Sequence, residues 1–255
     1  MTKSQIKKIY RSKKKEIRQS SKEQLAKVRR EYLDLLDVVE GDKIKSIPKR
    51  SILEEIGNSI THGVGALFAV AALVFMLLAS STPYHYAGAI IYSVGLFVMF
   101  TVSCLYHAFG RRLAAKRLFR RFDYCCIYLL IGATYAPILL NFIGGTFGCM
   151  FFVIQWLIII LGATLVAVFG QEKLKALHII MYIAIGWSGL LFLPQMFENN
   201  IGLFAFILGG GVVYSLGLIP FLMKRAVSHF IWHFFVLAGA VVQWFGIYCF
   251  IYLKY

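Results

Sequence analysis

Charged side chains are scarce in this chain outside its first fifty residues. Only 15% of the 255 residues are Asp, Glu, Lys or Arg, against about 25% in a typical soluble domain. Residues 1–50 hold 16 of the 27 Lys and Arg and 7 of the 12 Asp and Glu, so the remaining 205 residues carry 16 charges. Because 59% of the chain is hydrophobic, this remainder excludes a single soluble core and indicates a lipid bilayer as its solvent.

A secretory signal peptide and a cysteine framework are also missing. The basic start runs for about fifty residues before the first long apolar stretch, which no signal peptide does. The five cysteines fall in apolar segments without C-x-x-C spacing. We therefore expect neither a disulfide scaffold nor a thiolate metal site.

Long uncharged blocks predict seven transmembrane helices. Residues 56–110 and 124–171 each have room for two helices of about 20 residues, with turn residues near their middles at 80–83 and 141–145. Three further blocks each fit one helix, at residues 176–197, 199–223 and 226–253. Lipid provides no hydrogen-bond partner for unpaired backbone N–H and C=O groups, so only helices and closed β-barrels cross a bilayer. The blocks lack the alternation of apolar and polar residues that barrel strands show. The expected fold class is therefore all-α, a seven-helix transmembrane bundle.

The loop charges predict the orientation of this bundle. Beyond the basic N-terminal segment, Lys and Arg before the last two residues occur only in alternate loops: Arg111, Arg112, Lys116, Arg117, Arg120, Arg121, Lys173, Lys175, Lys224 and Arg225. The intervening turns contain neither residue type. The positive-inside rule then places the N-terminus in the cytoplasm and the C-terminus outside, in a multi-pass protein of the cell membrane.

The N-terminal segment forms its own region, so we expect two domains, a cytoplasmic one at residues 1–50 and a transmembrane one at 51–255. Its first nineteen residues are a basic run, disordered or lying on anionic headgroups. Ser20 and Glu23 fit a capping box, and apolar residues then recur at helical spacing, which predicts an amphipathic helix over residues 21–40. This helix lies on the membrane surface or against the bundle, or is a solvated extension. The positive charge points to lipid headgroups, and we expect no nucleic-acid partner.

Polar residues inside the predicted spans gather at one depth. Ionisable groups in a membrane are costly and usually functional. Four helices place them at their cytoplasmic ends: Glu55, Asn58, His62, Ser103, His107, Asp123, His229 and His233. The topology was assigned from Lys and Arg alone, so this agreement is independent of it.

Within that layer, histidine spacing suggests a metal site. His229 and His233 lie four residues apart, on one helix face, and His107 is a plausible third nitrogen ligand. Three histidines with an open fourth position are the arrangement of catalytic zinc. Phe230 stands where a zincin carries its glutamate, which excludes a soluble-type metalloprotease.

Each of these residues also has a simpler interpretation. A histidine at a helix end can be an interfacial hydrogen-bonding group rather than a ligand. Ser103 can bond its own helix backbone, and Asp123 can pair with Arg120 or Arg121. The metal-site interpretation depends on the convergence of the set and on no single residue.

Four motifs together resemble a known family. They are Glu55-x-x-Asn58-x-x-x-His62, Ser103-x-x-x-His107, Phe122-Asp123-Tyr124 opening the third helix, and His229-x-x-x-His233. In this order and on these helices they resemble the haemolysin III branch of the progestin and adipoQ receptor family. That family is related to adiponectin receptors and, more distantly, to alkaline ceramidases. The resemblance covers roughly residues 51–253.

The resemblance implies a seven-helix fold of non-GPCR topology with zinc near its cytoplasmic face. The implied ligands are His107, His229 and His233. The resemblance further implies that Ser103 and Asp123 flank a zinc-bound water. It places a polar cluster beside the site, formed by Glu55, Asn58 and His62. In eukaryotic relatives this site is associated with ceramide amide hydrolysis.

Three classes of function follow from these expectations. The leading one is a zinc-dependent hydrolase of lipid amides or esters, with Asp123 as general base and Ser103 orienting the water or stabilising the oxyanion. The second is a non-enzymatic receptor or regulator of membrane lipids with structural zinc. The third is a pore-forming haemolysin, which is disfavoured because the outer halves of the spans are almost purely apolar. Membrane lipids are the expected partners in the first two classes, and the sequence leaves the oligomeric state open.

Overall fold

A computed structural model describes residues 3–39, 47–110, 114–223 and 225–253. The described residues form helices and no strand, as expected. The chain divides into two compact units, Met1–Lys49 and Arg50–Tyr255.

The first unit contains one long helix, α1, spanning Lys3–Val39. It begins eighteen residues before the predicted start at residue 21. The basic run is rich in Lys, Arg, Glu and Gln, all good helix formers, and it contains no Pro or Gly to stop the helix. Every described side chain of α1, at residues 8–31, is exposed. The predicted end at Glu40 lies outside the described residues.

The second unit holds seven helical spans, as the uncharged blocks predicted. The first four are α3 (Ile52–Leu78), α4 (Pro83–Ala108), α5 (Ala114–Pro137) with the π-helical Ile138–Ile143, and α6 (Gly145–Phe169). The fifth is broken into α7 (Lys175–Gly186), the 3-10 segment Trp187–Phe192 and α8 (Leu193–Asn199). The last two are α9 (Ile201–Leu222) and α10 (Ser228–Ile247) with the π-helical Tyr248–Tyr252.

Local sequence signals set several of these ends. The Ser51 hydroxyl accepts a hydrogen bond from the Glu54 amide, which caps α3. Thr82 caps α4 in the same way, and Pro83 follows it at a position where a missing N–H does no harm. Asn200 caps α9 through the Leu203 amide. Pro137 removes one helical hydrogen bond, and the backbone continues as a π-helix from the next residue.

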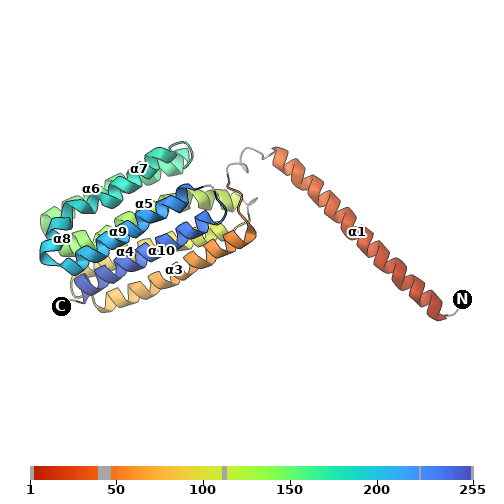
Figure 1. The fold of residues 1–255 in the computed structure, drawn as a ribbon, viewed down its shortest axis with the longest axis horizontal. Coiled ribbons are helices and arrows are strands. Elements are labelled where there is room, and N and C mark those ends of the chain that lie inside the picture. Colours follow the sequence, from red (N-terminus) through yellow and green to blue (C-terminus); the bar gives the residue numbers. More distant parts are fainter. Residues whose placement is uncertain (1–2, 40–46, 111–113, 224, 254–255) are drawn as a thin grey trace. The chain divides into compact units, whose positions relative to one another are not determined.

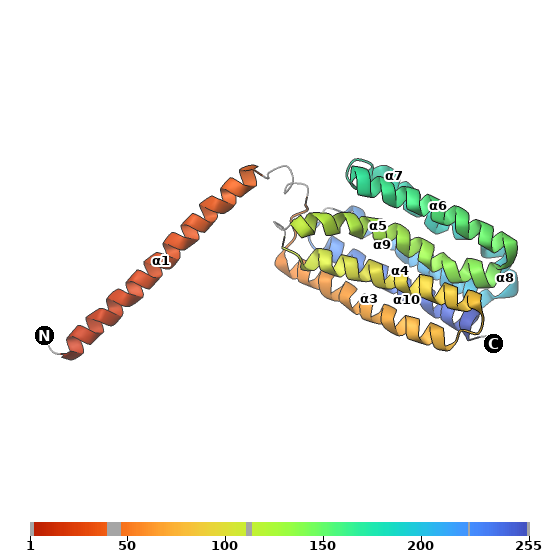
Figure 2. The ribbon, with the colours of Figure 1, turned by 180° about the vertical axis from the view of Figure 1, so that it is seen from behind.

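Consecutive spans run antiparallel, and α3 contacts both α4 and α10, the latter running in the same direction as α3 (Figure 1 and, from behind, Figure 2). α4 packs on α5, α5 on α6, and α10 on α9. Small residues allow this close approach: a Cβ atom on Gly95 would lie 2.2 Å from that of Ala133 on α5. The outward faces carry large exposed apolar side chains, among them Leu67, Leu78 and Leu157. Such an exterior suits lipid and not water.

The third span differs from the prediction in one respect. We expected Asp123 to open this helix and the preceding basic residues to lie in a loop. Instead α5 begins at Ala114, which places Asp123 in its third turn. Lys116 and Arg120 thereby enter the bundle, where they are 1% and 5% exposed. Charge marks where lipid contact ends, but a helix continues wherever its polar side chains find partners. The neighbouring Arg111 and Arg112, like Lys224, lie outside the described residues.

Candidate metal centre

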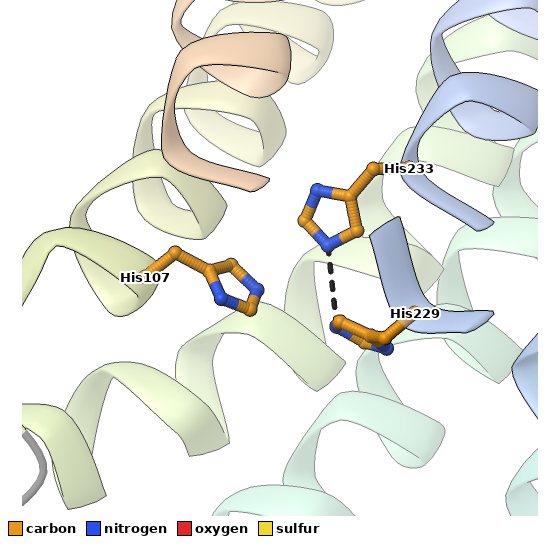
Figure 3. A group of neighbouring side chains, drawn as sticks. All are labelled: His107, His229 and His233. Atoms are coloured by element: carbon orange, nitrogen blue, oxygen red, sulfur yellow. Dashed lines mark hydrogen bonds between the residues drawn. The ribbon is translucent and has the colours of Figure 1, made fainter. Parts of the chain in front are cut away.

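Three histidines from two helices converge at one end of the bundle (Figure 3). His107 lies in the last turn of α4, and His229 and His233 lie one turn apart at the start of α10. Each offers one ring nitrogen, and these three atoms lie within 4.8 Å of one another. His107 and His233 are buried and His229 is partly buried, so this cluster is shielded from solvent.

The nitrogen geometry fits a metal ion. The Nε2 atoms of His229 and His233 lie 3.2 Å apart, close to the roughly 3.4 Å that separates two nitrogens on a tetrahedral zinc with 2.0–2.1 Å bonds. Without a metal, two Nε2 atoms at this distance can contact favourably only if one of them carries a proton and donates it to the other. His107 Nε2 is buried without a hydrogen-bond partner in the described part of the chain, and such an orphaned lone pair needs an explanation. A shared cation would provide one.

Two side chains of α3 lie at the opposite edge of the His107 ring. A Glu55 carboxylate oxygen lies 2.5 Å from His107 Nδ1, so the ring N–H donates to it. The Asn58 side-chain nitrogen, which is also a donor, lies 3.3 Å from the same ring nitrogen, so Asn58 is a neighbour of this edge and not a second hydrogen-bond partner. A carboxylate on Nδ1 leaves Nε2 as the unprotonated nitrogen that can bind a metal.

His62 approaches the cluster from a different side. Its ring stacks on His233, with centroids 3.8 Å apart and planes 26° apart. Both its nitrogens are buried without partners in the described structure. The structure therefore divides the predicted polar cluster: Glu55 and Asn58 reach His107, whereas His62 contacts His233.

Ser103 and Asp123 complete the set of predicted site residues. Ser103 lies on α4 one turn before His107 and is 1% exposed. Asp123 lies on α5, in its third turn. Both residues, with His62, His229 and His233, line one cavity. All eight residues singled out in the sequence thus lie in or beside a single site.

The cavity is mostly apolar and open on one side. A water-sized sphere has about 160 Å³ of room inside it, less than the roughly 300–1,000 Å³ of a drug-sized ligand site. From the histidines it extends between α7 with the following 3-10 segment and α9, past Trp187 and Gly211, to Ile138 and Gln243. A narrow apolar chain can therefore enter from the open side and lie beside the histidines.

Sequence reasoning missed one residue of this site, Lys116. Its ammonium group lies 3.0 Å from the second carboxylate oxygen of Glu55. Its charge predicts a loop position, but the residue lies in the first turn of α5. The helical spacing of Lys116 and Arg120, four residues apart and ahead of Asp123, was the available signal for an earlier start.

Two other histidines are also buried, although they had no evident partners in the sequence. His178 Nδ1 lies 2.9 Å from the Tyr128 hydroxyl, which joins α7 to α5. At the other end of the bundle, the Tyr252 hydroxyl donates to the His85 carbonyl. The His85 ring itself has a local partner, since its Nδ1 lies 3.3 Å from the Ser81 hydroxyl four residues earlier. The His178 partner lies 50 residues away along the chain, so no local pattern could reveal it.

Comparison with known proteins identifies the family. Residues 50–244 match the family described as "Haemolysin-III related". The chain is 33% identical over 199 residues to "Hemolysin-3" of Bacillus cereus, covering 76% of this chain and 90% of that protein. It is 31% identical over 206 residues to the "Hemolysin-3 homolog" of Bacillus subtilis strain 168, covering 78% and 96%.

A human protein named "Monocyte to macrophage differentiation factor" is 31% identical over 127 residues, which cover 48% of this chain and 51% of that protein. The family match spans every residue of the site described above. With its seven apolar helices, the chain is therefore a multi-pass membrane protein that belongs to the haemolysin III-related family.

Proposed function

We propose that this protein is a zinc-dependent hydrolase of a lipid amide or ester. The observation that carries the proposal is the position of the cluster: His229, His233 and Asp123 line the same mostly apolar cavity. A hydrolase for lipids needs a polar reaction centre beside an apolar space for the chain.

The metal chemistry follows from the ligand set. His107, His229 and His233 would hold zinc, since three neutral nitrogens with an open fourth position are typical of catalytic zinc sites. A bound zinc ion supplies Lewis acidity, which polarises a carbonyl group and makes water a nucleophile near neutral pH.

The protein's own residues would then transfer a proton from the attacking water to the leaving group. Asp123 accepts a proton from the attacking water and passes it to the leaving amine or alcohol as the carbonyl bond to it breaks. Ser103, which lines the same cavity as Asp123, would orient the attacking water or stabilise the oxyanion. Glu55 orients the His107 ring from behind.

The cavity accounts for a lipid substrate rather than a small polar one. Asp123 and Ile138 both line it, and fifteen residues of helix rise roughly 22 Å. An acyl chain can lie along this length with its amide or ester group at the histidines. Apolar side chains dominate the walls, among them Ile127, Ile131 and Val236.

Release of fatty acid from lipid amides and esters by the purified protein tests this proposal. We expect turnover that a chelator abolishes and zinc restores, and that falls at least about a hundredfold in Asp123→Asn. Glu198→Gln is the matched control, because this carboxylate is exposed on α8 and does not line the cavity. Turnover that is unchanged by chelator or by His229→Ala would exclude the mechanism.

A pore is a second candidate, favoured by the names of the two bacterial relatives, both called hemolysins. Against it, the cavity is lined mainly by apolar side chains, whereas ion pathways need polar groups through the depth of the membrane. Dye release from liposomes containing the purified protein separates the two candidates. Leakage that persists with the inactive Asp123→Asn would support the pore.

We further propose that the protein resides in the cell membrane with α1 and the histidine site on the cytoplasmic side. The described turn between α6 and α7 carries Lys173, and α1 is strongly basic, as the positive-inside rule requires of cytoplasmic segments. Labelling of single cysteines placed at Lys14 and Lys173 in intact cells tests this orientation. Both positions should resist a membrane-impermeant reagent.

A further inference from the structure

Lys116 is a buried cation with an unusual environment. It lies in the first turn of α5 and is 1% exposed, although lysine is almost never fully buried unless paired. Its ammonium group lies 3.0 Å from a Glu55 carboxylate oxygen, 3.5 Å from the His107 carbonyl oxygen and 4.5 Å from the centre of the Tyr106 ring. All three contacts come from residues in or next to the metal site.

Glu55 connects this cation to the histidine cluster. One carboxylate oxygen accepts from His107 Nδ1 and the other accepts from Lys116. The Glu55 side chain is 20% exposed, so without a second partner it can rotate toward solvent. An ion pair on the far oxygen holds the carboxylate in the plane that the His107 ring requires.

We propose that Lys116 is a positioning residue for the metal centre: through Glu55 it fixes the His107 ring so that Nε2 faces His229 and His233. The inference depends on the metal site of the proposed function but adds a residue that takes no part in the hydrolysis. Partners that orient a ligand histidine typically change metal affinity by about 10–100-fold.

The contact with the His107 carbonyl gives Lys116 a second connection to α4. It ties the backbone of the ligand's own turn to α5, the helix that carries Asp123. The metal ligands and the proton acceptor thus come from different helices, and Lys116 lies where those helices are fixed to each other.

Metal affinity of the full-length purified protein tests the inference. Cobalt(II) is titrated into the metal-free protein and followed by its visible absorption, with zinc measured by competition against a chelating dye. We expect Lys116→Met to weaken both affinities about tenfold. Lys173→Met is the matched control, because it removes an exposed lysine from the turn before α7, and its affinities should equal those of the wild type.

A double-mutant cycle shows whether Lys116 acts through Glu55. If it does, Glu55→Gln combined with Lys116→Met should bind metal no more weakly than the worse single variant, because the two changes break one chain of contacts. Independent packing effects would instead multiply, giving about a hundredfold loss. Multiplied losses would overturn the inference.

Two further measurements distinguish a folding defect, and a failure of the proposed function, from a failure of this inference. Thermal unfolding of the metal-free variants reports on fold, and Lys116→Arg, which keeps the charge, should recover part of the affinity if Lys116→Met unfolds. Equal affinities in wild type and Lys116→Met would overturn this inference alone. A wild-type protein that binds neither metal would overturn the proposed function and leave no ligand for Lys116 to position.

Discussion

The protein uses charged residues in two opposite ways. In α1 every described side chain is exposed, and ten Lys and Arg with three Glu at residues 8–31 are free to be solvated. In the bundle, two cations of the histidine end are buried and paired, Lys116 with Glu55 and Arg120 with Glu172. The same residue types therefore act as a diffuse charge in one unit and as fixed structural contacts in the other.

This difference has an energetic basis. An exposed lysine keeps its hydration, and a change there usually alters stability by less than about 0.5 kcal/mol. A buried charge has lost its hydration and depends on a partner, so removing that partner costs about 3–5 kcal/mol. Substitutions of like residues in the two units should then differ by an order of magnitude in effect.

Charge reversal at one lysine in each unit tests this comparison most strongly. Lys116→Glu places a second carboxylate beside Glu55, and we expect a loss of about 3–5 kcal/mol in the free energy of unfolding. Lys15→Glu, on exposed α1, should change it by less than about 0.5 kcal/mol. Unfolding in mixed detergent micelles measures both, and equal losses would contradict the comparison.

Removal of a histidine ligand should affect binding more than fold. His233→Ala takes away one of three nitrogens, and we expect zinc affinity to fall at least about a hundredfold. Metal content after dialysis against a weak chelator measures this. His85→Ala is the control, since that histidine lies outside the cluster at the other end of α4. Stoichiometric zinc in His233→Ala would show that the ligands are others.

A bulky residue in the cavity should affect substrate and leave metal unchanged. Gly211 lines the cavity, and a Cβ atom added there would meet only Trp187, at 3.8 Å. Gly211→Leu therefore extends into the free space, and we expect kcat/KM for a long-chain lipid amide to fall about tenfold. Val212→Phe, on the exposed side of the same helix, should leave it unchanged. Loss of zinc in Gly211→Leu would contradict the separation of the two functions.

The smallest effect should come from single charges of α1. We propose that α1 lies on anionic lipid, because exposed Ile9, Ile17 and Val28 accompany its basic residues. Backbone hydrogen exchange of α1 should be slower in anionic than in zwitterionic bilayers, and high salt should remove the difference. Lys14→Gln should reduce the protection about fivefold, because one lysine at an anionic membrane surface contributes about 1 kcal/mol to binding. Equal exchange in both bilayers would point instead to a second copy of the chain or to solvent.

Much of the fold was predictable from the sequence because lipid imposes strict rules. The seven spans follow from uncharged length, and the breaks at Pro83 and Gly144 follow from turn chemistry. The i, i+4 histidines on α10 follow from helical periodicity. These signals are local, so they can be recognised in the sequence without knowledge of the fold.

The early start of α5 escaped the same reasoning. Charged residues predict the end of a membrane span, yet Lys116 and Arg120 are helical and buried because Glu55 and Glu172, 61 and 52 residues away, pair with them. A partner at such a distance is not visible in a local window. The burial of His178 by Tyr128 escaped for the same reason.

The sequence by itself determined an all-helical membrane bundle, the number of its spans and the set of polar residues at one end. Only the tertiary structure decided which of those residues touch: Glu55 and Asn58 on His107, His62 on His233, and Lys116 behind Glu55. Hydropathy and periodicity are properties of a single segment, and they decide for each segment separately whether it crosses the bilayer as a helix. Contacts between side chains depend on the rotation and separation of whole helices, which only their packing fixes.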